Sequence, residues 1–187
     1  MKSSSDGKKT DRKKLEELFR KHGYEDFKWM DPRGIVVAQW ARMKCMFGCK
    51  NYGKCGTCPP NVPPVAESQA FFKGYRRGVV FHFSKGVDRP EDRFAWTRKV
   101  NSKLLELGRE VFLSGYYKAF LLFMDSCNLC ASCSGDREQC KNPKLSRPTP
   151  ESMAVDVFET VRKIGYPIDV LREYSQDMNR YAFLMID

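Results

Sequence analysis

The chain has 187 residues, a net charge of +10 and a hydrophobic content of 42%, including 13 Phe and 8 Tyr. This composition excludes a disordered chain, and the length is enough to bury a core without disulfide bonds. No apolar run approaches the roughly 20 residues of a membrane-spanning helix, and the polar N-terminus lacks the apolar region of a signal peptide. We therefore expect a cytoplasmic protein that does not enter a membrane.

The positive charge is unevenly distributed. Residues 1–14 contain six Lys or Arg and two Asp, so they supply four of the ten net positive charges. We expect residues 1–10 to be a disordered basic tail and residues 11–187 to form a single domain. The excess charge serves solubility or docking to an acidic partner. Since no nucleic-acid-binding signature accompanies it, we do not expect nucleic acid as a partner.

The first half of the domain alternates between helical and extended patterns. Leu15, Leu18 and Phe19 have the spacing of a helix that starts near Asp11 and ends at Gly23. The β-branched run that starts at Ile35 predicts a strand. The further predicted elements are an extended stretch at 26–30, a turn at 32–34, a strand at 35–40, a helix at about 65–73 and a strand at 76–83.

The second half predicts a strand–helix–strand unit. An apolar stripe predicts a long helix at about 90–113, followed by a buried strand at 117–124. Together with the strand at 76–83, this is a βαβ unit, normally a right-handed crossover between parallel strands. Thr149 and Pro150 predict the start of a helix that reaches about 164, and a final strand covers 181–186. The fold class is therefore α/β, with a small open sheet, a βαβ unit, helices and two cysteine-rich metal-cluster loops.

Four of the eight cysteines follow the strand at 117–124. They are Cys127, Cys130, Cys133 and Cys140, called the downstream array below. Two-residue gaps between the first three let a chain curl around three corners of a [4Fe–4S] cluster. Cys140 follows after six residues instead of the usual three, with Pro143 beyond it. We favour Cys140 as the fourth ligand of the same cluster, and the alternative is that it ligates a second cluster.

The other four cysteines form an upstream array, Cys45, Cys49, Cys55 and Cys58. Its first gap of three residues is like that of radical enzymes that use S-adenosylmethionine. In those enzymes the third cysteine follows after two residues, which it does not do here, so we reject this class of enzyme. Four thiolates for a second [4Fe–4S] cluster is the simplest interpretation. A structural zinc site with four thiolates is the alternative, especially for the upstream array.

Both arrays resemble the signatures of a known family. The first is Arg42-Met-Lys-Cys45, Cys49 and Tyr52-Gly53, ending in Cys58-Pro59-Pro60. The second comprises the downstream array, Pro143, Arg147-Pro148 and the segment Asp156–Thr160. Together they are similar to a family of predicted cysteine-rich metal-binding proteins, common in methanogens and other anaerobes and classified as a domain of unknown function. The resemblance covers roughly residues 35–185 and implies metal or iron–sulfur binding and anaerobic physiology, but no reaction.

The chain departs from the family pattern at Cys55. The family's first signature rests on the positions of Cys45, Cys49 and Cys58 alone. The resemblance therefore implies that one iron of the upstream cluster is open to another ligand, unless Cys55 binds it.

Three functions follow from these expectations. The first is electron transfer by two [4Fe–4S] clusters to a redox partner protein, which the basic surface predicts to be acidic. The second is an enzyme that uses an open iron of the upstream cluster for small-molecule, sulfur or redox chemistry. The third is a zinc-stabilised interaction module.

Overall fold

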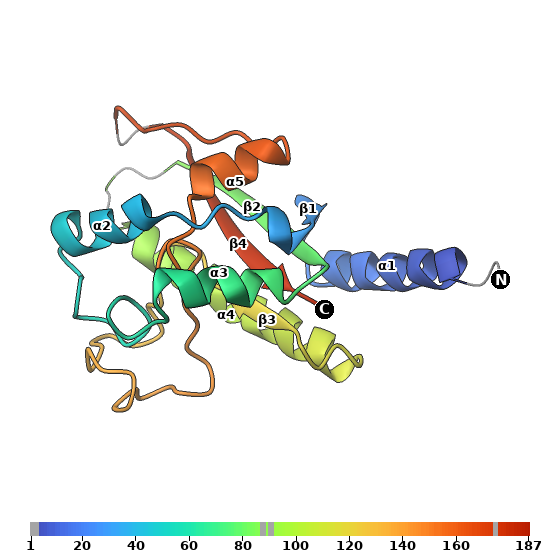
Figure 1. Ribbon diagram of the computed structural model, residues 1–187, viewed down its shortest axis with the longest axis horizontal. Coiled ribbons are helices and arrows are strands. Elements are labelled where there is room, and N and C mark those ends of the chain that lie inside the picture. The colour runs from blue at the N-terminus through green and yellow to red at the C-terminus, as the bar shows by residue number, and fades with distance from the viewer. Residues whose placement is uncertain (1–3, 87–88, 90–91, 174–175) are drawn as a thin grey trace.

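The computed structural model describes residues 4–86, 89, 92–173 and 176–187. In this part of the chain, helices cover both faces of a small sheet (Figure 1). The helices are α1 (Ser4–Lys21), η1, a short 3-10 helix (Pro32–Gly34), α2 (Gln39–Gly48), α3 (Val65–Lys73), α4 (Asp92–Leu113) and α5 (Val157–Lys163). The strands are β1 (Phe27–Met30), β2 (Gly78–Lys85), β3 (Phe120–Leu122) and β4 (Met178–Met185).

The sheet has the order β1-β2-β4-β3, and each neighbouring pair is antiparallel. Because β2 and β3 both pair antiparallel with β4, they run in the same direction, and α4 connects them. The predicted strand–helix–strand crossover is therefore present, and the α/β class is confirmed. The difference is that β4, the last strand in the sequence, lies between the two parallel strands.

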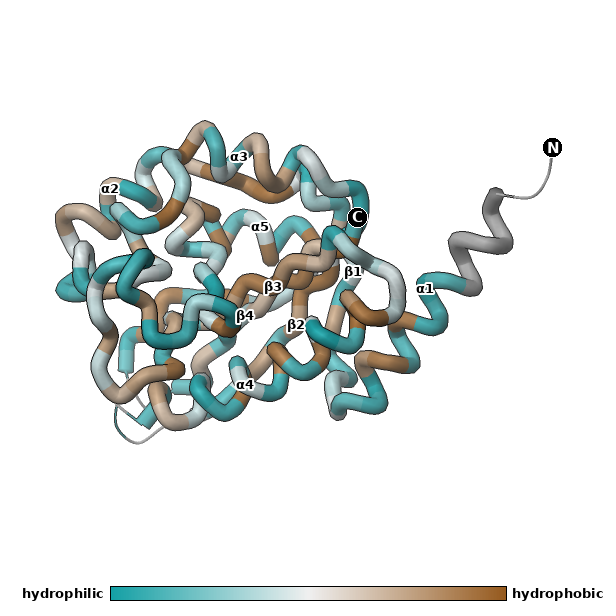
Figure 2. The backbone as a smooth tube through the Cα atoms, turned by 90° about the horizontal axis from the view of Figure 1, so that it is seen from below, coloured by the Kyte–Doolittle hydropathy of each residue, from teal (hydrophilic) through white to brown (hydrophobic). Residues whose placement is uncertain are grey.

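Two hydrophobic clusters cover the two faces of the sheet. Val79 and Phe81 of β2 face one cluster, which includes Phe19 of α1 and Leu107 of α4. Val80, between them, faces the other cluster, which includes Phe72 of α3 and Val161 of α5. This alternation is what a strand requires when helices pack on both faces. Figure 2 shows the resulting apolar strands at the centre of the molecule.

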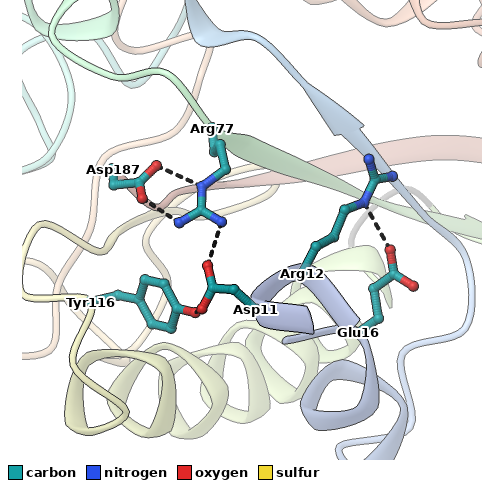
Figure 3. A network of polar contacts seen from close by, with 6 residues as sticks. All are labelled: Asp11, Arg12, Glu16, Arg77, Tyr116 and Asp187. Atoms are coloured by element: carbon teal, nitrogen blue, oxygen red, sulfur yellow. Dashed lines mark hydrogen bonds and ion pairs between the residues drawn. The ribbon is translucent and has the colours of Figure 1, made fainter. Parts of the chain in front are cut away.

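Helix α1 is attached to the domain by a polar network around Arg77 (Figure 3). The Arg77 guanidinium donates to Asp11 Oδ2 over 2.7 Å and to Asp187 Oδ1 over 2.8 Å. Tyr116 donates to the other oxygen of Asp11. The network therefore joins the first helix, the segment after α4 and the last residue of the chain. None of the helices in the described ranges is both long and apolar enough to span a membrane.

The structure differs from the predicted elements at several boundaries. Helix α1 begins at Ser4, whereas we expected a helix only from Asp11. The predicted start of the long helix at Pro90 lies outside the described residues. The strand predicted at 35–40 is wrong, because only Val37 makes an isolated bridge, with Val155, and α2 begins at Gln39.

Only the second half of the helix predicted from Pro150 to about residue 164 is helical. The backbone N–H of Thr149 donates to the Ser152 hydroxyl, and the N–H of Ser152 donates to the Thr149 hydroxyl. This pair of hydrogen bonds stabilises only a turn. Ala154 then adopts a φ of 61°, which no helix accommodates. The helix α5 starts afterwards, where Asp156 caps it by accepting from the N–H of Glu159 over 2.9 Å.

Candidate metal centre

Both cysteine arrays lie at one end of the molecule, away from α1 (Figure 1). The upstream loop, residues 49–64, connects α2 to α3. The downstream loop, residues 125–148, leaves β3 and returns to the sheet, where the N–H of Phe123 donates to Pro148 O over 2.9 Å. The two loops lie side by side although they are about seventy residues apart in the sequence.

Helix α4 fixes the start of the downstream loop. The Asn101 side chain is fully buried and forms hydrogen bonds with both the N–H and the C=O of Met124 over 3.2 Å. One turn earlier, Thr97 accepts from the Asn128 side chain over 2.8 Å. These contacts satisfy backbone and side-chain groups that a loop would otherwise bury without partners. Cys127 is therefore presented from a rigid stem.

The second half of the downstream loop contains hydrogen bonds to two of its thiols. The side-chain amide of Asn142 donates to Cys130 Sγ over 3.0 Å. Cys140 Sγ lies 3.5 Å from Ser146 Oγ, which also accepts from Arg137. A hydrogen bond donated to sulfur, as from Asn142 to Cys130, influences the reduction potential of a bound cluster.

The upstream array starts on α2. This helix carries Cys45 and ends at Gly48, and Cys49 follows it with an extended backbone, φ −98° and ψ 117°. The buried side chain of Arg42 donates to Pro63 O over 3.0 Å and so ties α2 to the far end of the upstream loop. Cys58 closes a turn by donating its N–H to Cys55 O over 3.1 Å.

The two loops are joined by direct contacts. Asn61 donates to Gly135 O over 2.9 Å and to Cys55 O over 3.3 Å. Gly56 packs so closely on the downstream loop that an added Cβ would lie 2.7 Å from Asp136 O. Only glycine permits this approach. The two arrays therefore form one structural unit.

Cys55 lies between the arrays. Hydrogen bonds from Cys58, Thr57 and Cys133 lower the pKa of Cys55 to about 5. The same interaction raises the pKa of Cys58, which donates the shared proton. Cys55 also acts electrostatically on Cys127, whose pKa is raised mainly by burial. Cys55 thus contacts thiols of both arrays.

The remaining three upstream cysteines border a common cavity. Cys45, Cys49 and Cys58 line a space of about 160 Å³ together with Asp125 and Glu151. These two carboxylates come from the start of the downstream loop and from the turn before α5. The cavity therefore collects three soft and two hard ligand groups from distant parts of the chain.

Both carboxylates have unusual surroundings. Asp125 is a non-glycine residue at φ 64°, a conformation that often marks a functional site, and its Oδ2 lies 3.3 Å from Arg93 Nε. Glu151 is an exposed residue, but protein atoms around its carboxylate desolvate it and raise its pKa. Its charge also contributes to raising the pKa of Cys45, behind the larger effects of burial and of Cys49.

The donor set fits a soft metal centre. All eight cysteines are free thiols, and all are contributed by the two adjoining loops and α2. Thiolates are the ligands of iron–sulfur clusters and of structural zinc. Among the described residues, no three His, Cys, Asp or Glu side chains are arranged to hold a single metal ion as they stand.

Eight free thiols at one end of a small α/β domain are typical of a metal-binding protein. The chain belongs to the family DUF2284, described as predicted metal-binding proteins, which matches residues 28–186 and therefore includes both arrays. No curated protein and no solved structure matches the chain.

Several residues of this site were not predicted from the sequence. They are Asn61, which joins the loops, Asn101 and Asn142, which bind the downstream loop, and Glu151 in the cavity. Asparagine close to cysteine is the signal that was available for Asn142, but it does not reveal which sulfur the side chain reaches.

Proposed function

We propose that this protein carries two [4Fe–4S] clusters and transfers electrons to a redox partner. The observation that carries the proposal is the contact between the two loops at Asn61 and Gly135, which places eight free thiols in one unit. Bound there, two clusters would supply one-electron redox chemistry. The cytoplasmic location of the protein remains a prediction.

The downstream array would hold one cluster through Cys127, Cys130, Cys133 and Cys140. Asn142 supports this assignment, since its side-chain amide donates to the sulfur of Cys130. Asn101 and Asn128 keep the loop in place before the metal binds. The protein's part is thus to orient the thiolates and to set their hydrogen bonding.

The upstream array would hold the other cluster through Cys45, Cys49 and Cys58. One observation favours three thiolates over four: Cys45, Cys49 and Cys58 border one cavity that Cys55 does not line. Three thiolates leave one iron for a different ligand. This favours a second candidate function, an enzyme in which a small molecule binds that iron.

The partner's docking surface is proposed on α2. Trp40, Met43, Met46 and Phe47 form an exposed apolar patch on this helix, and Phe47 alone is 78% exposed. The exposed side chains of Lys44, Lys50 and Lys54 lie on the same helix and the loop that follows. An apolar patch with a basic rim beside Cys45 and Cys49 suits an acidic protein that exchanges electrons there.

Electron paramagnetic resonance of cysteine variants tests the assignment. Cys133→Ser should remove or alter the signal of one reduced cluster, and Cys49→Ser that of the other. Cys55→Ala should leave both signals in place if three thiolates hold the upstream cluster. Loss of the upstream signal in Cys55→Ala would mean that four thiolates hold the upstream cluster, and it would exclude an open iron. Colourless protein with bound zinc would contradict both candidate functions and support the zinc-stabilised module.

A further inference from the structure

A second, larger cavity adjoins the cysteine site. It has a volume of about 560 Å³ and lies between α2, the start of α5 and β4. Cys45, Cys49 and Glu151 border this cavity and also the smaller one that contains Cys58. A molecule in the larger cavity would therefore lie directly beside two of the candidate metal ligands.

The size and lining of the cavity are those of a small-molecule site. Its volume falls within the range of about 300–1,000 Å³ that is usual for ligand pockets. Trp40, Val155, Phe158, Ile168 and Tyr181 contribute apolar or aromatic surface from four different segments. Such a lining accommodates an apolar or aromatic body, while a few polar groups decide its orientation.

Arg180 is the polar group with unused binding capacity. Its Nε is buried and has no hydrogen-bond partner among the described residues. Within the part of the chain that the structure describes, its other nitrogens make only long contacts, 3.5 Å to Asn179 O and 3.6 Å to Met178 Sδ. The Arg180 charge reaches the carboxylate of Glu151, but no ion pair of Arg180 is found within the described ranges. The terminal nitrogens of Arg180 keep capacity for an anion, because contacts as long as these are weak hydrogen bonds.

Two other carboxylates of the cavity already have partners. Asp156 accepts the N–H of Glu159 as the cap of α5, and Asp169 lies 3.2 Å from Arg162. The second cation, Lys44, lies over the ring of Trp40 at 5.1 Å. Glu151 is the remaining carboxylate of the cavity, and the Arg180 charge already acts on it. The guanidinium is therefore the cation available to a planar carboxylate, through paired N–H donors.

We propose that this cavity binds a small monocarboxylate with an apolar or aromatic body, its carboxylate on Arg180 and its body against Trp40 and Phe158. The site goes beyond electron transfer, and it does not depend on which metal the thiols hold. It gives the cysteine centre a small-molecule ligand as a neighbour.

The test uses metal-loaded full-length protein and matched pairs of probes. Benzoate, phenylacetate and isovalerate are compared with their neutral amides by ligand-observed NMR titration. At least one acid should bind saturably and about tenfold or more tightly than its amide. Arg180→Gln should remove this preference, and Arg180→Lys should retain part of it. Trp40→Ala should weaken the acid and the amide alike.

Lys163→Gln is the matched control. Lys163 is the last residue of α5, pairs with Glu159 and does not line the cavity. The variant should leave all dissociation constants unchanged. The proposal is overturned if no acid binds, if acids and amides bind equally, or if Arg180→Gln binds the acids as tightly as the unaltered protein does. Metal content measured on each sample keeps a failure of the cluster proposal separate from a failure of this one.

Discussion

The side-chain amide of Asn61 donates a hydrogen bond to the backbone oxygen of Gly135 over 2.9 Å and thereby joins the two cysteine loops. The same side chain also donates to the backbone oxygen of Cys55, so Asn61 joins the two loops next to the residue that carries this thiol. The arrays therefore act as one unit, and a change at their junction should affect both.

Gly56→Ala tests the junction. The new Cβ would lie 2.7 Å from Asp136 O, so one of the loops must move. We expect a loss of about 1–3 kcal/mol in the free energy of unfolding and a lower metal content, both measured after anaerobic purification. Gly48→Ala is the control, because nothing lies within 4 Å of its added Cβ. Equal stability and metal content in the two variants would show that the loops are not joined as described.

Asn142→Leu tests the hydrogen bond to Cys130. The donor lies 3.0 Å from the sulfur and stabilises negative charge there, so its loss disfavours the reduced cluster. We expect the reduction potential of the downstream cluster to fall by on the order of 50 mV in redox-titrated paramagnetic resonance. Ser134→Ala serves as the control, since its hydroxyl donates to Asp136 O and not to a cysteine among the described residues. An unchanged potential in Asn142→Leu with full iron content would exclude this role.

The helices α1, α3 and α4 and most strands follow from sequence periodicity, as Leu104, Leu107 and Val111 on the buried side of α4 illustrate. The helix α2 was not predicted. The run from Ile35 was misleading, because β-branched residues also suit the extended segment that enters α2. The helix start predicted at Thr149 was wrong: its hydroxyl caps only a turn, which Ala154 ends at φ 61°, and α5 starts after Asp156.

The candidate site was only partly predictable for a related reason. Spacing identified the eight cysteines as two arrays, and this grouping follows from chain geometry alone. The environment of Cys55 could not be predicted from spacing. Thr57 is close to Cys55 in the sequence, but Cys133 reaches it from the other loop. Position in three dimensions, not spacing, decides which thiols face the cavity of Cys45 and Cys58.

Charge reversal on α2 tests the docking surface. Lys44→Glu with Lys50→Glu should slow reduction of the protein by a reduced acidic ferredoxin, about tenfold at low salt, because the steering charge is reversed. Stopped-flow absorbance at several ionic strengths measures the rate. Lys13→Glu with Lys14→Glu places the same change on α1, at the opposite end of the molecule, and should have little effect (Figure 1). Equal slowing at both ends would mean that net charge, not a docking surface, governs the reaction.

Acid should release α1 from the domain. Partial burial alone would raise the pKa of Asp11, but hydrogen bonds from Tyr116 and Arg77 outweigh it and lower the pKa. A lowered pKa contributes stability that is present above the unfolded value of about 4 and is lost as the pH falls through the folded value. We therefore expect the unaltered protein to lose stability below about pH 4 more steeply than Asp11→Asn, as measured by chemical denaturation. Parallel pH profiles would contradict this contribution.

The most direct test of the central claim is the iron and acid-labile sulfide content of anaerobically purified protein. Two [4Fe–4S] clusters predict a brown protein with about eight iron and eight sulfide per chain. Zinc without sulfide, in a colourless protein, would contradict the account.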